Sequence, residues 1–150
     1  KYPVSIFNYG FRENSGGLGK FRGGVGLYRE YTINTDGFVS LWFERSVTPA
    51  WGLFGGKDGL PPNVNIKIPN EEEKNLLKTN GLQIKNGTVL TTYTGGGGGF
   101  EEPLERDPEN VLDDVKNRYV TIEKAKEDYK ISITSDLKID QDSTDKLRKN

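Results

Sequence analysis

The chain has 150 residues with a net charge of −1, 19 glycines, and no histidine, cysteine or methionine. This composition excludes zinc fingers, disulfide frameworks, cysteine nucleophiles and Ser-His-Asp triads, so any chemistry must use carboxylates, lysine, tyrosine, hydroxyls or backbone amides. The near-neutral charge predicts no nucleic-acid partner. No apolar run approaches the ~18 residues that cross a bilayer, so we expect no membrane association and a cytoplasmic location.

The first hundred residues predict short strands that alternate with glycine loops. Strands are expected, from β-branched and aromatic content, at 3–9, 27–33, 38–43, 64–68 and 88–93. Asp36-Gly37 is typical of a tight turn, so we expect 27–33 and 38–43 to form a hairpin. Residues 70–74 are polar and are expected to form a solvated linker.

The last fifty residues have a different character and predict helices. Asp107 followed by Pro108 is a helix start, with apolar residues Val111, Leu112 and Val115 on one face. Thr121 is expected to cap a second helix and Asp142 a third that runs over 143–149, with short extended pieces between 131 and 139. Strands followed by helices indicate an α+β fold, with a mainly antiparallel sheet and a small helical C-terminal part.

The domain organisation follows from this division. We expect a glycine-rich β region over 1–100 and a helical end over 101–150, in one domain or in the C-terminal fragment of a larger subunit. The sequence starts at Lys1 without an initiator methionine. We interpret this as a part of a longer polypeptide rather than the product of leader removal.

Fifteen of the glycines fall in three clusters, at 16–26, 52–59 and 95–99. Glycine lets another molecule approach the backbone closely, and successive amides can converge on a phosphate, a carboxylate or a developing oxyanion. The alternatives are tight turns and bulges for the first cluster, an aromatic core wedge for the second, and a flexible linker for the third. The candidate anion- or substrate-binding residues are Ser15, Gly16, Gly17, Gly19, Lys20, Arg22, Gly55, Gly56, Lys57, Gly96, Gly97 and Gly98.

Carboxylates are abundant, but their spacing assigns no catalytic residue. Glu101, Glu102, Glu105 and Asp107 follow the third cluster closely. One interpretation is a local ion-pair network through Glu105-Arg106-Asp107. The other is that Asp107 caps a helix and the remaining carboxylates are solvated.

Three blocks of the sequence together resemble the hydantoinase B family, which includes the corresponding half of 5-oxoprolinase. Residues 12–31 are similar to the pattern RxDSGGxGxxRGGxGxxREY, residues 51–59 to WGxxGGxxG, and residues 94–108 to TPGGGGYGDPLERDP. The tail around Asp114 and Tyr119 resembles a DVxxGYVS stretch. Asn14 stands where the family has Asp, which removes a charge from a position that a metal ligand or base would need.

The resemblance implies a function and partners. It implies the C-terminal part of the B-type subunit of an ATP-dependent cyclic-amide hydrolase, in which an actin-like A-type ATPase subunit phosphorylates the lactam oxygen and the B-type partner delivers water. ATP and magnesium would lie in the A-type subunit, and any divalent metal in the upstream part of the B-type one, because this chain has no histidine. The isolated chain would be inactive. Alternatives are a subunit of an acetone- or acetophenone-type carboxylase and a non-catalytic docking domain.

Overall fold

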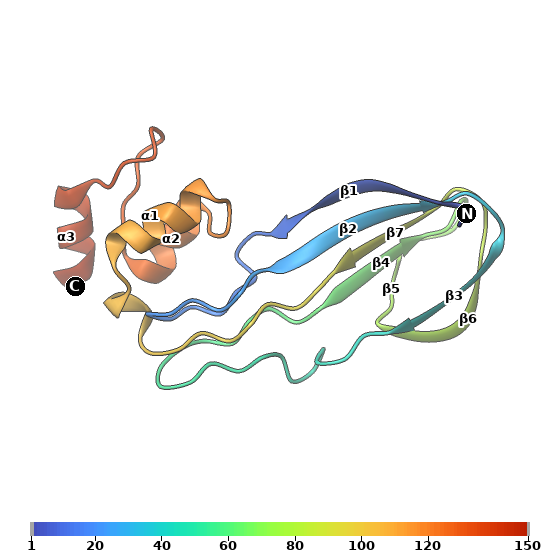
Figure 1. Cartoon of the computed structure of the whole chain (residues 1–150), viewed down its shortest axis with the longest axis horizontal. Coiled ribbons are helices and arrows are strands. Elements are labelled where there is room, and N and C mark those ends of the chain that lie inside the picture. The colour runs from blue at the N-terminus through green and yellow to red at the C-terminus, as the bar shows by residue number, and fades with distance from the viewer. Residues whose placement is uncertain (1, 150) are drawn as a thin grey trace.

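The computed structural model describes residues 2–149 and has sheets at one end and helices at the other (Figure 1). The strands are β1 (Val4–Arg12), β2 (Gly26–Ile33), β3 (Gly37–Trp42), β4 (Asn63–Lys67), β5 (Lys74–Asn75), β6 (Lys78–Ile84) and β7 (Thr88–Tyr93). A short 3-10 turn (Pro103–Glu105) precedes the helices α1 (Pro108–Lys116), α2 (Ile122–Tyr129) and α3 (Gln141–Lys149). The α+β class is confirmed.

The strands form two antiparallel layers. The larger sheet has the order β1-β2-β7-β4-β5, and β3 pairs with β6 in a separate two-stranded sheet. Side chains from both layers meet in one apolar core, whose buried members are Leu41, Val64, Ile66, Ile68 and Ile84. The two layers therefore form a small sandwich at the end of the molecule that lies away from the helices (Figure 1).

The expected hairpin through Asp36-Gly37 is wrong. Strand β2 lies between β1 and β7, and β3 pairs with β6 instead. A tight two-residue turn of type I′ needs positive φ at both central residues, and neither Asp36 nor Gly37 has it. The segment crosses from one layer to the other, and the Asp36 carboxylate accepts a hydrogen bond of 2.8 Å from the backbone N–H of Asn86. Strand β6, which the sequence analysis did not predict, takes the expected partner's place.

The helical end has its own core. Its buried residues come from α1, from α2 and from the segments that follow them: Val111, Leu112, Val115, Val120, Ala125, Tyr129, Ile131 and Ile133. Asp107 and Thr121 cap α1 and α2 as predicted, because each side chain accepts a backbone N–H of the first turn. The predicted cap of α3 is wrong. Asp140, and not Asp142, accepts the Ser143 N–H at 3.0 Å, and the helix starts at Gln141.

Candidate functional site

The three glycine clusters lie side by side between the sheets and the helices (Figure 1). We call residues 15–26, 50–60 and 94–100 the glycine bundle. A Cβ atom added to Gly96 would lie 1.8 Å from the Ser15 carbonyl oxygen, and one added to Gly23 would lie 2.0 Å from the Gly97 carbonyl oxygen. The glycines are therefore needed because the backbones of neighbouring segments touch where a side chain would stand.

Backbone hydrogen bonds join the three segments of the bundle. The Gly17 N–H donates to the Gly97 oxygen at 2.8 Å, and the Gly97 N–H donates to the Gly24 oxygen at 2.8 Å. The Lys57 N–H donates to the Leu18 oxygen at 2.7 Å. These amides are thus satisfied within the protein, and the third cluster is a packed element instead of the flexible linker considered as its alternative.

Turn geometry explains few of these glycines. Within residues 2–149, Gly55, Gly81 and Gly87 are the glycines with positive φ, and only Gly55 belongs to the bundle. The interpretation of the first cluster as turns and bulges therefore does not account for it. The aromatic wedge expected in the second cluster is also absent, because Trp51 and Phe54 are 62% and 76% exposed.

The other glycine candidates also lie where an added side chain would meet neighbouring atoms. A Cβ would meet backbone of another bundle segment within 2.0–3.1 Å at five of them: Gly17, Gly19, Gly56, Gly97 and Gly98. At Gly16 it would meet the Gly23 oxygen of the same segment at 2.2 Å, and at Gly55 the Glu102 side chain at 2.1 Å. Ser15 is fully buried, and its hydroxyl accepts the Gly26 N–H at 2.8 Å while it donates to the Arg12 carbonyl. Ser15 thus joins the start of the bundle to β2. Anion binding by these residues stays a prediction.

Two of the three candidate cations are engaged in ion pairs. The Lys20 amino group lies 3.0 Å from Glu101 and 3.3 Å from Glu105, and these two carboxylates raise the pKa of Lys20. The Arg22 guanidinium lies 3.0 Å from Asp114. Glu105 therefore pairs with Lys20 rather than joining the network expected with its neighbours along the chain.

Asp114 is the centre of a buried ionic cluster that the sequence analysis missed. One of its carboxylate oxygens lies 3.0 Å from Arg22, and the other lies 2.8 Å from Arg106. The three side chains are 7%, 13% and 12% exposed. Nearby, burial raises the pKa of the Tyr129 hydroxyl to about 12. The sequence does contain one indication of this cluster, because Asp114 follows Val111 by three residues and so lies on the apolar face of α1.

Asn14 joins the start of the bundle to the helical end. Its side-chain oxygen accepts the Thr121 N–H at 2.9 Å, and its amide group donates to the Thr121 hydroxyl at 3.4 Å. Its φ is 59°, a left-handed conformation in which asparagine and aspartate are favoured over other side chains. This residue therefore has a structural function at the N-terminus of α2.

We expect Asn14→Ala to destabilise the chain by about 1–2 kcal/mol, because it removes the acceptor and leaves alanine in a strained conformation. Asn14→Asp is the matched variant, which keeps the acceptor and places a negative charge near the positive end of the α2 dipole. We expect it to stay within about 0.5 kcal/mol of the parent chain. Urea titration measures both, and equal losses in the two variants would contradict this assignment.

Lys57 borders a hollow of about 340 Å³ between the bundle and α2. The hollow is lined by Asn14, Gly16, Leu18, Lys57, Asp58, Leu60, Val120, Lys124 and Asp128. Among residues 2–149, the Lys57 amino group has no ion-pair or hydrogen-bond partner, whereas Lys124 lies 3.0 Å from Glu127. Lys57 is thus the candidate cation with its charge available to an anion.

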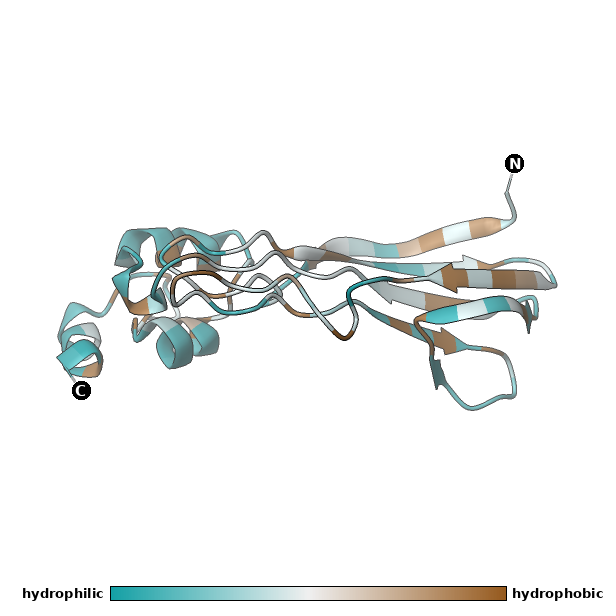
Figure 2. Cartoon of the chain, turned by 90° about the horizontal axis from the view of Figure 1, so that it is seen from below, coloured by the Kyte–Doolittle hydropathy of each residue, from teal (hydrophilic) through white to brown (hydrophobic). Residues whose placement is uncertain are grey.

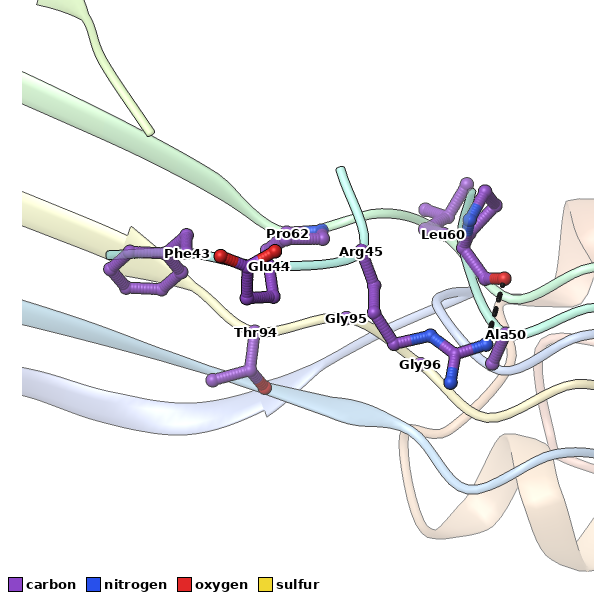
Figure 3. Close-up of a pocket in the computed structure, with 10 residues that line it drawn as sticks. Phe43, Glu44, Arg45, Ala50, Leu60, Pro62, Thr94, Gly95 and Gly96 are labelled. Carbon is purple, nitrogen blue, oxygen red and sulfur yellow. Dashed lines mark hydrogen bonds between the residues drawn. The ribbon is translucent and has the colours of Figure 1, made fainter. Parts of the chain in front are cut away.

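A second hollow, of about 330 Å³, lies where the larger sheet meets the bundle (Figure 3). Its charged groups are already engaged. The Arg45 guanidinium donates to the Pro49 oxygen at 3.2 Å, and Glu44 lies 2.8 Å from Lys78. We therefore place the candidate site at the Lys57 hollow.

Other kinds of site receive no support from the described residues. Between residues 2 and 149, no three acidic side chains are grouped so as to hold a metal ion. None of the helices in the same range has the length and apolar composition of a membrane span.

Comparison with known proteins provides the family. The model of the family described as hydantoinase B/oxoprolinase matches residues 1–103. The chain belongs to the hydantoinase B/oxoprolinase family. The resemblance inferred from the glycine blocks is thereby confirmed.

Curated relatives of this hydantoinase B/oxoprolinase chain are longer. It is 34% identical over 150 residues to the putative B-type subunit of a D-/L-hydantoinase from a Pseudomonas species, covering 99% of the chain and 25% of the relative. Over 148 residues it is 32% identical to the beta chain of the caprolactamase of Pseudomonas jessenii, covering 95% of the chain and 26% of the relative. The chain thus spans about a quarter of the length of these relatives.

Solved structures share the fold of this family member. The ATP-dependent caprolactamase from Pseudomonas jessenii superposes with a TM-score of 0.77 at 27% identity, over 99% of this chain and 27% of that one. An acetone carboxylase in its nucleotide-free form superposes with a TM-score of 0.76 at 21% identity, over 98% of this chain and 24% of that one. At that identity, the second likeness is one of fold alone.

Proposed function

We propose that this chain is the C-terminal part of the B-type subunit of an ATP-dependent enzyme that opens cyclic amides. The observation that carries the proposal is its likeness, in sequence and in structure, to an ATP-dependent caprolactamase. The family match over residues 1–103 supports the same class of enzyme. The likeness to acetone carboxylase extends to the fold only, so we prefer a hydrolase to the carboxylase alternative.

Within that enzyme, the chain would form one side of the site and contribute one cation, Lys57, that is free to pair with an anion. The glycine bundle is held by backbone contacts and hydrogen bonds, so it can present the Lys57 hollow without rearrangement. An ammonium group beside an oxyanion or phosphoryl group stabilises the charge that develops there during amide activation. We assign Lys57 as the counter-charge for an anionic intermediate or product.

The remaining chemistry would be supplied from outside this chain. An A-type subunit with an actin-like fold would bind ATP and magnesium and phosphorylate the amide oxygen. Any divalent metal of the B-type subunit would be held by residues upstream of the matched stretch. Together they would form a hetero-oligomer, and we propose the cytoplasm as its location.

Lys57→Glu is expected to lower turnover at least about 100-fold while association with the A-type subunit is retained, because the charge reversal repels the developing anion. The assay is ADP release by the complex of the complete B-type subunit and its A-type subunit with 5-oxoproline, hydantoin and acetone. Lys138→Glu, an exposed lysine outside the hollow, is the control and should leave turnover unchanged.

The same variants separate this proposal from a docking domain. If Lys57→Glu lowers association before turnover, the chain is a docking domain and the proposed site is wrong. Lys20 and Arg22 are less suitable for this test, because both are engaged in ion pairs that support the fold. Release of ADP that depends on acetone, and not on a cyclic amide, would support the carboxylase alternative.

A further inference from the structure

Strand β1 has one apolar and one polar face. Partners in an antiparallel ladder point to the same side of the sheet, and Val4 pairs with Ile33, which packs against the sandwich core. Ile6 follows Val4 on that side, and its pairing partner is Tyr31. After an irregularity between Ile6 and Asn8, Tyr9 pairs with Arg29 and resumes the same side.

The opposite face of β1 is polar. Ser5 pairs with Thr32, and Asn8 pairs with Glu30. The Ser5 hydroxyl also accepts a hydrogen bond of 2.8 Å from the Asn34 side chain. The apolar face of β1 is therefore continuous with the core side of the large sheet, and the polar face is the solvated side.

The covering layer stops before it reaches β1. The β3–β6 sheet covers β4, where Val64 and Ile66 are fully buried. On β1, by contrast, Val4 is 41% exposed and Ile6 is 64% exposed. Figure 1 shows β1 at the edge of the sheet that lies opposite β3 and β6, and Figure 2 shows patches of hydrophobic colour on the strand that follows the N-terminus. Within residues 2–149, the part of the apolar sheet face that β1 contributes therefore has no covering layer.

The chemistry of this surface specifies what fits it. No charged side chain occurs on β1 itself from Val4 to Phe11, and Tyr9 and Phe11 are 58% and 52% exposed. The charged group that borders this surface is the Arg29 guanidinium of β2, which lies over the Tyr9 ring at 4.8 Å from its centroid. A contiguous apolar patch of this kind is typical of an interaction surface, and the part of it around Val4 and Ile6, away from Arg29, favours an apolar occupant. The matched relatives are about four times as long as the stretch that they share with this chain. A B-type subunit of that length has further segments available to cover the sheet.

We propose that the apolar face of β1 is covered by a segment of the B-type subunit outside these 150 residues. That segment extends the β3–β6 layer with apolar side chains over Val4 and Ile6. This inference rests on the proposed function in so far as it takes the chain to be part of a B-type subunit. Burying side chains such as Val4 and Ile6 removes apolar surface from water, which favours stable docking of the segment.

The absence of cysteine makes a direct test available, because one introduced thiol is a unique reporter. Ile6→Cys places the thiol on the apolar face, and Ser5→Cys is the matched control on the opposite face of the same strand. Each variant is labelled with a maleimide under two conditions. In the first the variant chain is alone, and in the second it is mixed with the part of the related Pseudomonas hydantoinase chain that lies outside the matched quarter. Intact mass of the 150-residue chain gives the labelling rate.

We expect the added polypeptide to slow labelling of the Ile6→Cys variant at least tenfold and to leave the labelling rate of the Ser5→Cys variant unchanged. Equal rates, or equal slowing at both positions, would overturn the proposal. If labelling of the Ile6→Cys variant slows as the concentration of this chain rises, with no added polypeptide, the proposal is overturned and a second copy of the chain covers the face. Should the added polypeptide not fold, the same rates are compared in a chimera in which this chain replaces the matched quarter. No turnover is needed, so the Lys57 test stands independently.

Discussion

Asp114→Ala is expected to lower the free energy of unfolding by about 3–5 kcal/mol, because it leaves two buried guanidinium groups without their shared carboxylate. The Asp114 side chain is 7% exposed, and it bonds Arg22 and Arg106 through different oxygens. Arg106 also donates to the Lys20 carbonyl at 2.8 Å, so the cluster ties α1 to the bundle. Urea denaturation at neutral pH, followed by circular dichroism, measures the loss.

The neighbouring residue supplies the control for Asp114. Asp113 is 69% exposed and lies 3.9 Å from Lys116, so Asp113→Ala should cost less than about 0.5 kcal/mol. Replacing Arg22, Asp114 and Arg106 together by Met, Leu and Met removes both the charges and their desolvation penalty, and should recover most of the loss. Equal midpoints for Asp114→Ala and Asp113→Ala would show that the cluster does not hold the two parts together.

Gly23→Ala is expected to cost at least about 3 kcal/mol, because its methyl group would overlap backbone that has no room to move. The added Cβ would lie 2.0 Å from the Gly97 oxygen and 2.8 Å from the Gly98 oxygen. The neighbouring segments are held by their own hydrogen bonds, so relieving the overlap means separating part of the bundle. The thermal midpoint and the yield of folded chain measure the effect.

Gly24→Ala is the matched control, one residue away in the same segment. A Cβ at Gly24 meets no atom of residues 2–149 within 4 Å, and the φ of Gly24 is not positive. Alanine there should be neutral, or stabilising by up to about 1 kcal/mol, since it restricts the unfolded chain. If both substitutions have the same effect, close backbone packing is not the reason for the glycine at position 23.

Local chemistry accounts for the parts of the fold that could be predicted. Strand 88–93 and the starts of α1 and α2 follow from β-branched content and from side chains that cap a helix within one turn. The pairing of strands could not be predicted in this way. Asp36-Gly37 has the composition of a hairpin turn, but the partner of β3 lies some forty residues further along, where no local signal marks β6.

The candidate site shows the same division. The glycine blocks and Lys57 were found from composition and family resemblance. Asp114 and Arg106, which hold the bundle on the helices, were missed because their partner Arg22 is far away in the sequence. Lys20 and Arg22 form ion pairs with carboxylates from other segments, whereas Lys57 forms none among residues 2–149. Only the folded chain therefore distinguishes Lys57 from the other two candidate cations.

The sequence by itself determined the family, the α+β class and the exclusion of histidine and cysteine chemistry. Those properties depend on residue types and on short spacings. The tertiary structure decided what the glycines do. A missing side chain has no effect until another backbone occupies its place, and the segments that do so here, 15–26, 50–60 and 94–100, meet only after the chain has folded.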